Sequence, residues 1–449
     1  MQSAAVEYTL AKWLRNGGWW LAERTLTIVL AVVVQIVVVR VLGAAAYGEI
    51  AYSLAILGLL LPIAQAGANG LVGRALIDAP GDERAIIAAA LQIRIFGSTI
   101  ALLGGLLYWT FVEPDRDQAA MIALLVCQTA LCFQVIEQKY QVVADGKPLA
   151  MARMLVISLA AAAKITAALV FGSPAAVLLV YAVESLTHGI AHAGVFSRDV
   201  GYWPRPSGRS SWRRWFVTRS PWLVVSGFAE AVYLKIDILM LERLSEPREI
   251  GLYALAARIS EIWLIIPTIL VATGFARLWE HRQPTALFDR ELQRWLDLLV
   301  TLGLIVALTL TFLSSPLVTI LFGNELADAA PVLAIHVWCG LFAAMRVLLS
   351  RWLMVQDYVG ISLMTTMLGA TTNVALNYWL IPSYGASGAA VATVVSYGVA
   401  GFLSLFLLSR TRSLAKQMAK ALLIPLRWGD LRNHFATLRQ RVATSSNER

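Results

Sequence analysis

Long apolar runs alternate with short polar segments along almost the whole chain. A membrane-spanning α-helix needs about 20 mainly apolar residues, and the pattern predicts twelve helices of that kind. The expected fold class is therefore an all-α polytopic membrane protein. The expected spans are 17–40, 47–72, 85–111, 118–140, 149–171, 174–196, 220–242, 250–276, 295–322, 329–350, 358–381 and 386–409.

Composition supports a membrane environment. Hydrophobic residues make up 58% of the chain and charged residues only 14%, whereas soluble domains carry about 25% charged residues. Single hydrophobic cores stop growing at about 250–300 residues, and this chain has 449. The excess apolar surface therefore requires lipid as its solvent.

The basic residues are distributed unevenly between alternate connections. If the N-terminus is cytoplasmic, inner segments hold 27 of the 37 basic residues and outer loops hold four. Cytoplasmic loops are enriched in Lys and Arg, so both termini are expected in the cytoplasm of a bacterial inner membrane. The net charge of +9 follows from these loops, and no nucleic-acid partner is expected.

The longest connection is a basic segment between the sixth and seventh spans. The tail alternates Leu414 and Met418 with Lys416 and Lys420, which suits a helix lying on an anionic leaflet. A disordered basic tail beyond Pro425 is the alternative. The expected organisation is an N-terminal six-helix bundle (1–196), a basic cytoplasmic linker (197–219), a C-terminal six-helix bundle (220–409) and a basic cytoplasmic tail (410–449).

The two halves contain related segments. "VLGAAAYGEIAYSLAI" leads to "LLLPIAQAG", and "RLSEPREIGLYALAARI" leads to "LIIPTILVATG", so that Gly48 matches Gly251 and Pro62 matches Pro267. Both segments begin on the same side of the membrane. Two parallel six-helix bundles related by an axis along the membrane normal are typical of transporters, with the substrate path between them.

Ionisable residues within the spans are the main candidates for function. Each charge in a span costs about 3 kcal/mol on the insertion scale, so these residues must face one another or a water-filled cavity. Eleven of them, histidines aside, lie away from the ends of the predicted spans and are taken as candidates: Arg24, Arg94, Lys164, Lys235, Arg258, Arg346, Glu23, Glu184, Glu230, Asp237 and Glu261.

Three of the cations, Arg94, Lys164 and Arg346, have no acidic neighbour close in sequence. Such cations indicate an anionic passenger, with pairing to acids on other helices as the alternative. Together with Arg24 and Lys235 they form the predicted substrate-binding set.

Helical spacing places the acidic candidates on the faces of two different predicted spans. Glu230, Tyr233 and Asp237 share one face of the seventh span. Glu184 lies on a polar face of the sixth span that includes Tyr181, His188 and His192. We expect Glu184, Glu230 and Asp237 to bind a coupling ion, either a proton or sodium. Arg258 and Glu261 are three residues apart and are expected to form a structural pair. No metal site and no cofactor are expected.

Further polar and small residues are predicted to pack helices together. Asn373 and Asn377 can hydrogen-bond across helices. Gly388, Ala392, Ser396, Ala400 and Ser404 form a stripe of small residues that would let a neighbouring helix approach closely.

Three segments carry a family resemblance. "VVVRVLGAAAYGEIAYSLAILGLLLPIAQAG" resembles the opening of polysaccharide-exporting flippases of the Wzx type. "YLKIDILMLERLSEPREIGLYALAARISEIWLIIP" is similar to their seventh and eighth helices, and "NVALNYWLIPSYGASGAAVATVVSY" to their eleventh and twelfth. These motifs cover roughly a fifth of the chain and occur in the family's order.

The resemblance implies the V-shaped fold of the multidrug/oligosaccharidyl-lipid/polysaccharide export superfamily, also called MATE-like. It implies that an undecaprenyl-pyrophosphate-linked oligosaccharide, such as an O-antigen, capsule or exopolysaccharide unit, is flipped to the periplasmic leaflet. Asp237 matches the family's acidic position in the seventh helix. Expected partners are that lipid-linked oligosaccharide, membrane lipids, a coupling ion and other polysaccharide-assembly proteins.

Other functions remain open at this stage. A drug/cation antiporter of the same fold should present a net acidic cavity, whereas the eleven candidate residues are six positive and five negative. A membrane glycan polymerase or ligase usually needs a large outer loop, and the outer loops here are short. A lipid-linked peptidoglycan precursor is a further candidate substrate. No "GxxxxGK[ST]" motif is present, and the protein is not expected to be an enzyme.

Overall fold

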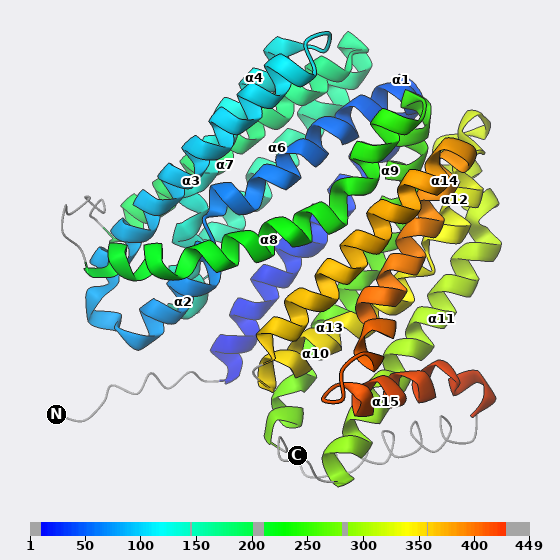
Figure 1. The fold of residues 1–449 in the computed structure, drawn as a ribbon. Coiled ribbons are helices and arrows are strands. Elements are labelled where there is room, and N and C mark those ends of the chain that lie inside the picture. The colour runs from blue at the N-terminus through cyan, green and yellow to red at the C-terminus, as the bar shows by residue number, and fades with distance from the viewer. Residues whose placement is uncertain (1–9, 144–145, 201–210, 281–285, 357, 428–449) are drawn as a thin grey trace, which may run out of the picture. The chain divides into compact units, whose positions relative to one another are not determined.

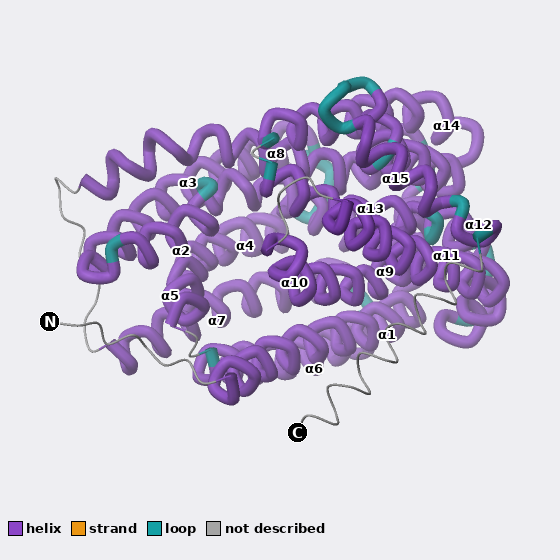
Figure 2. Tube along the Cα trace, turned by 90° about the horizontal axis from the view of Figure 1, so that it is seen from below, coloured by secondary structure: helices purple, strands orange, loops and turns teal. Residues whose placement is uncertain are grey.

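The computed structural model describes residues 10–143, 146–200, 211–280, 286–356 and 358–427. Over these residues every regular element is a helix, as Figure 2 shows. Contacts divide the chain into two compact units, Met1–Leu239 (unit 1) and Met240–Arg449 (unit 2).

Unit 1 is built from long helices that pack side by side: α3 packs on α4, α4 on α7 and α7 on α6 (Figure 1). Its helices are α1 (Leu10–Gln65), α2 (Ala68–Asp78), η1 (Pro80–Asp82), α3 (Glu83–Val112), α4 (Gln118–Gln128), η2 (Thr129–Ile136), α5 (Glu137–Val143), α6 (Lys147–Phe171), α7 (Pro174–Val200) and α8 (Ser211–Leu244), whose last residues enter unit 2.

Unit 2 contains the remaining helices, and α12 packs against α9, α11 and α14. Its elements are α9 (Pro247–Glu261), η3 (Ile262–Leu264), α10 (Ile265–Glu280), α11 (Ala286–Phe322), η4 (Asn324–Leu326), α12 (Ala329–His336), α13 (Cys339–Val355), α14 (Val359–Gly401), η5 (Leu403–Phe406), α15 (Arg412–Leu422) and η6 (Ile424–Leu426).

The two longest helices are each more than twice as long as the hydrocarbon layer is thick. α1 has 56 residues and α14 has 43, and at 1.5 Å per residue either exceeds the roughly 30 Å of hydrocarbon. Each bends sharply at a glycine, Gly43 (φ 82°) in α1 and Gly385 (φ 52°) in α14. Because a side chain disfavours positive φ, glycine is the residue that allows these tight reversals.

The helix count confirms the predicted fold class. Nine helical segments of the described residues are long and apolar enough to span a membrane. Two of them, Gly18–Asp78 and Gly360–Phe406, contain the bends at Gly43 and Gly385 and are long enough for two crossings each. α8 is not counted because charged residues are spread along it. With α8 added, the described helices account for the twelve expected spans.

Ion pairs at the helix ends agree with the predicted alternation of sides. Lys139 contacts Glu83 at 2.9 Å, and both were expected on the inner side. Arg248 contacts Asp328 at 2.8 Å, and both were expected on the outer side. These two contacts are consistent with the predicted alternation, which stays a prediction together with the assignment of one side to the cytoplasm.

The boundary between the halves differs from the predicted linker. Contacts group the chain up to Leu239 with unit 1, whereas the predicted division lies at 197–219. In α8, Gly227 lies against Pro62 of α1, and Leu223 lies against Gly67. The six-plus-six division at the linker stays a prediction, and residues 201–210 of that linker lie outside the described residues.

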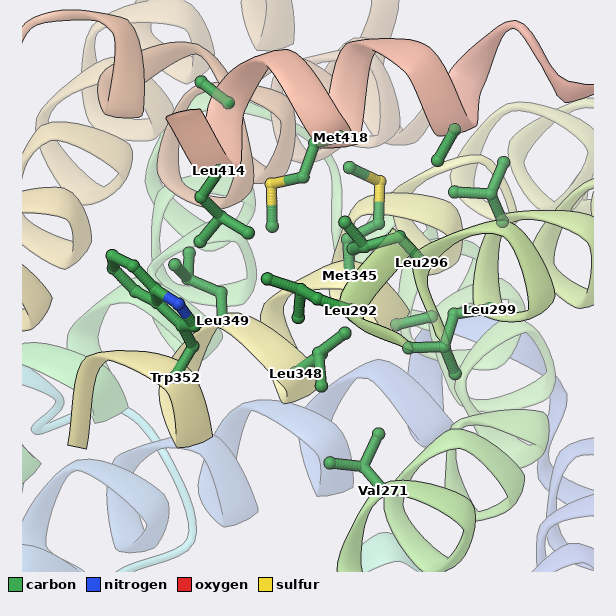
Figure 3. Close-up of a cluster of buried hydrophobic side chains, with 14 of the residues drawn as sticks. Val271, Leu292, Leu296, Leu299, Met345, Leu348, Leu349, Trp352, Leu414 and Met418 are labelled. Carbon is green, nitrogen blue, oxygen red and sulfur yellow. The ribbon is translucent and has the colours of Figure 1, made fainter. Parts of the chain in front are cut away.

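The helix predicted in the tail is present as α15. Its apolar side chains Leu414 and Met418 are buried among Leu296 of α11 and Met345 and Leu349 of α13 (Figure 3). Figure 1 shows α15 crossing the end of α11 rather than running along it. The apolar face of α15 therefore packs on protein, while the Lys416 and Lys420 side chains are exposed. The tail beyond residue 427 lies outside the described residues.

Close helix packing in unit 1 depends on Gly97. A Cβ atom added to Gly97 of α3 would lie 2.4 Å from the Ile63 carbonyl oxygen of α1. Gly104 lies two turns further along α3 and has nothing within 4 Å of the same position. We predict that Gly97→Ala lowers the free energy of unfolding by about 1–3 kcal/mol, because α1 and α3 must separate.

Gly104→Ala is the matched control, and it is expected to be neutral or to stabilise by up to about 1 kcal/mol through helix propensity. Thermal unfolding of the purified protein in detergent measures both. Equal midpoints for the two variants would contradict the proposed contact.

Candidate functional site

Lys164 and Glu184 form a buried ion pair between α6 and α7. Lys164 Nζ lies 2.6 Å from Glu184 Oε2 and 3.6 Å from the centre of the Tyr181 ring. Only 9% of the Lys164 side chain and 16% of the Glu184 side chain are exposed. Of the two alternatives for Lys164, the structure shows pairing with an acid on another helix. The polar face predicted on the sixth span is thus turned toward α6.

Arg94 is buried in unit 1 without a carboxylate. Its side chain is 2% exposed and donates hydrogen bonds to the Asn69 side-chain oxygen and, at 3.4 Å, to the Leu131 carbonyl. Asn69 follows the break between α1 and α2, where Ala66 and Gly67 take positive φ. The break therefore places the Asn69 side-chain oxygen beside the Arg94 guanidinium. Both hydrogen-bond acceptors of Arg94 among the described residues are neutral oxygen atoms.

In unit 2, neutral oxygen atoms likewise accept the hydrogen bonds of Arg346. Its Nη1 donates to the Ala400 carbonyl at 2.9 Å, and its Nη2 donates to Thr366 Oγ1 at 2.6 Å. Ala400 and Thr366 lie on opposite sides of the bend in α14, so Arg346 of α13 holds both halves of that helix. Among the described residues, neither Arg94 nor Arg346 forms an ion pair.

The predicted face of α8 is only partly buried. Tyr233 and Asp237 are both 3% exposed, whereas Glu230 is exposed and Lys235 is half-buried. The Lys235 aliphatic chain passes about 3.5 Å from the Cβ position of Gly58 in α1. Tyr233 and Asp237 therefore share the side that packs on protein.

Three other predicted residues lie on exposed surfaces. Arg24 of α1 is exposed, and so are Arg258 and Glu261 of α9. The roles of Arg24 in substrate binding and of the Arg258–Glu261 pair in the scaffold stay predictions.

Two buried polar clusters escaped the sequence analysis. Arg153 of α6 contacts Glu23 of α1 at 3.1 Å and Glu137 of α5 at 2.9 Å. Arg153 lies near the start of the predicted span 149–171 and is not among the candidate charges, although it lies more than one turn inside α6. In unit 2, His336 is 1% exposed and lies between Tyr253 and Ser260 of α9. A single histidine in an apolar run carries no pattern, so only the fold identifies it.

The structural predictions for α14 are confirmed. Asn377 donates to the Asn373 side-chain oxygen at 2.9 Å, and Asn373 donates across the bend to Ser396 Oγ at 3.3 Å. The stripe from Gly388 to Ser404 is buried throughout. A Cβ on Gly388 would meet the Leu380 carbonyl at 2.5 Å, which explains why a small residue is required there.

Two family models match the chain. The model of the family described as "Polysaccharide biosynthesis protein" matches residues 13–275, which is more than half of the chain. The MatE model matches residues 223–379. The second match starts in α8 and covers most of unit 2.

One curated relative and several solved structures are similar. The probable low-salt glycan biosynthesis flippase Agl15 of Haloferax volcanii is 24% identical over 182 residues, which is 40% of this chain and 39% of the relative's length. The structure of lipid II flippase MurJ in an inward closed conformation has a TM-score of 0.67 at 13% identity and covers 90% of each chain.

An inward-facing multidrug resistance MATE family transporter of the MOP superfamily has a TM-score of 0.59 at 15% identity, covering 85% of this chain and 95% of the other. These structural similarities establish a MATE-like fold. The family model spans α1 to α10 and therefore includes Arg94, the Lys164–Glu184 pair and Asp237. The chain accordingly belongs to the polysaccharide biosynthesis protein family.

Proposed function

We propose that the protein flips an anionic lipid-linked oligosaccharide, carried on undecaprenyl pyrophosphate, from the cytoplasmic to the periplasmic leaflet by alternating access. Family membership and the flippase named among its relatives support a role in glycan assembly. A pyrophosphate joined to a polar glycan cannot enter hydrocarbon unaided, because its hydration must be replaced. The proposed activity is transport without covalent chemistry.

One observation carries this proposal. Each unit keeps a partly or fully buried arginine, Arg94 or Arg346, whose partners are neutral oxygen atoms. Guanidinium groups bind phosphate oxygens through paired, charge-assisted hydrogen bonds. Among the described residues, each unit thus has a buried or half-buried arginine that forms no ion pair, which favours an anionic cargo. It opposes the runner-up function of a drug/cation antiporter, which the MatE match would otherwise suit.

The Lys164–Glu184 pair suggests how an ion gradient could act on the cargo. While Glu184 is ionised, it holds Lys164 at 2.6 Å. Protonation of Glu184 would remove that attraction and free the ammonium for a phosphate oxygen. Glu230 and Asp237 of α8 are proposed as further ion-coupling residues, and either a proton or sodium could bind them.

We predict that vesicles containing the purified protein will move undecaprenyl pyrophosphate bearing a fluorescently labelled N-acetylglucosamine between leaflets. Externally added dithionite quenches only the outer-leaflet label, so flipping appears as additional quenching. Vesicles with fluorescent lipid II and vesicles with a cationic dye are run in parallel. Movement of the dye without either lipid-linked sugar would replace the flippase proposal with the antiporter, and movement of lipid II alone would assign a peptidoglycan precursor.

A second prediction separates two roles for Lys164. Lys164→Ala leaves Glu184 buried and unpaired, which should lower stability by about 3–5 kcal/mol and abolish flipping without preventing membrane insertion. The double variant Lys164→Ala/Glu184→Ala removes both charges and should recover part of the stability. If Lys164 binds cargo, the double variant still fails to flip. Restored flipping would show that the pair is only structural.

A third prediction concerns Arg346. Arg346→Ala should reduce flipping at least about tenfold, because one hydrogen bond to a charged group contributes about 1.5–3 kcal/mol. Arg346→Lys keeps the charge but not the paired geometry, so its flipping rate should lie between that of the native protein and that of Arg346→Ala. Arg351 of the same helix is exposed, so Arg351→Ala is the control. Equal rates for Arg346→Ala and this control would refute a role for Arg346 in transport.

A further inference from the structure

α15 lies beside the beginning of α11, at the level where the predicted hydrocarbon span of that helix starts. The Gln417 side chain of α15 donates to Asp289 Oδ1 at 3.1 Å, and its backbone carbonyl accepts from Gln293 at 3.2 Å. Both partners precede residue 295, where the hydropathy of the chain predicts that the ninth span begins. Figure 1 shows α15 crossing α11 rather than running along it. α15 therefore lies along the membrane plane, at the depth of the lipid headgroups.

The apolar face of α15 is not available to acyl chains. Leu414 and Met418 are buried in the hydrophobic cluster that α15 forms with α11 and α13 (Figure 3), and Ala421 is buried in the same cluster. Helices that bind membranes by insertion use such a face to enter the boundary between headgroups and acyl chains. Because protein already covers this face, contact between α15 and lipid is left to the opposite side of the helix.

Three basic residues form the opposite side of α15, and we call them the basic stripe: Arg412, Lys416 and Lys420. They are spaced four residues apart, so their side chains project from one side of the helix, and all three are exposed. Arg412 Nε donates to the Phe406 carbonyl at 3.1 Å. Within the described part of the chain, none of the three forms an ion pair. The stripe therefore presents three positive charges to its surroundings.

Two acids of α11 lie against α15 or the residues that follow it, and neither neutralises the stripe. Asp289 is exposed and accepts from the neutral Gln417 side chain. Asp297 is buried, accepts from Gln293 at 2.7 Å and lies 3.9 Å from Arg427 Nη1. Arg427 follows α15 and balances the buried carboxylate. The positive charge of the stripe is thus left for a partner outside the described chain.

We propose that the basic stripe binds anionic phospholipids, whose phosphate charge is not offset by an amine in the headgroup. Arg and Lys donate charge-assisted hydrogen bonds to phosphate oxygen atoms. Leu423 is exposed three residues beyond Lys420 and provides apolar contact for the adjoining part of an acyl chain. Each basic residue near an anionic membrane surface contributes about a fivefold preference, so three together contribute about a hundredfold. The bound lipid holds α15 against α11 and α13, whichever cargo the protein carries.

The first experiment detects lipid at the stripe itself. In the full-length protein, Leu423 is replaced by the photoreactive residue p-benzoylphenylalanine, and the protein is placed in nanodiscs with equal amounts of phosphatidylglycerol and phosphatidylcholine. Mass spectrometry then identifies the lipids that irradiation attaches. We expect at least about ten attached phosphatidylglycerols for each phosphatidylcholine at low salt. The same replacement at Leu103, an exposed apolar residue of α3, is the matched control and should show no preference. Equal lipid ratios at the two positions, or no attached lipid at Leu423, overturn the proposal.

Charge variants test the stripe in the same cross-linking background. Lys416→Gln/Lys420→Gln removes two exposed charges and should lower the phosphatidylglycerol excess at least about tenfold. Lys416→Arg/Lys420→Arg keeps the charges and should retain the excess. Arg213→Gln/Arg214→Gln removes two exposed basic residues of α8 and is the charge-matched control, which should also retain it. If the Gln and Arg variants of the stripe select lipids equally, positive charge is not the cause and the proposal fails.

The second experiment measures salt dependence and stability. The Debye length falls from about 10 Å at 0.1 M salt to about 3 Å at 1 M, so the phosphatidylglycerol excess should largely disappear at 1 M. Phosphatidylglycerol should also raise the thermal unfolding midpoint of the native protein, and Lys416→Gln/Lys420→Gln should lose at least half of that rise. An equal rise in this variant would show that anionic lipid acts elsewhere. Loss of the lipid excess on adding inorganic phosphate at constant ionic strength would replace the lipid site with a site for free phosphate.

Discussion

In hydrocarbon, a polar or charged side chain has no water to bind and must find its partners inside the protein. This constraint organises the interior of both units. Lys164 meets Glu184, Arg153 meets Glu23 and Glu137, and Arg94 and Arg346 are held by amide, hydroxyl and carbonyl oxygens. The helices can approach closely enough for these contacts because glycines and alanines line their interfaces, as at Gly97 and along the stripe in α14.

The two units satisfy the constraint in different ways. Unit 1 contains buried ion pairs, such as Lys164–Glu184, beside the Arg94 side chain that neutral oxygen atoms hold. The centre of unit 2 instead relies on neutral groups, in which His336, Tyr253 and Thr393 share hydrogen bonds. A proton added to an ion pair redistributes an existing interaction, whereas a neutral network disfavours any added charge.

Interruptions of the helices connect packing to function. The break at Ala66 and Gly67 delivers Asn69 to Arg94, and the bend at Gly385 brings Ala400 and Thr366 onto one guanidinium. The breaks beside Ser260 and His336 place the histidine between two helix ends. Side chains held at such points are sensitive to small changes in helix direction. A bound phosphate at these positions can therefore bias the arrangement of whole helices.

The amino-acid sequence by itself was enough to predict the twelve spans, the alternation of basic loops, the α14 packing stripe and the family. Each of these can be recognised from local periodicity, hydropathy or short motifs. Only the tertiary structure decided which buried charges meet. Nothing near Lys164 in the sequence identifies Glu184 as its partner, and Arg153 and His336 follow no local pattern. Such pairings depend on the rotation and depth of helices that are distant in the chain, and these are set by packing of the whole unit rather than by neighbouring residues.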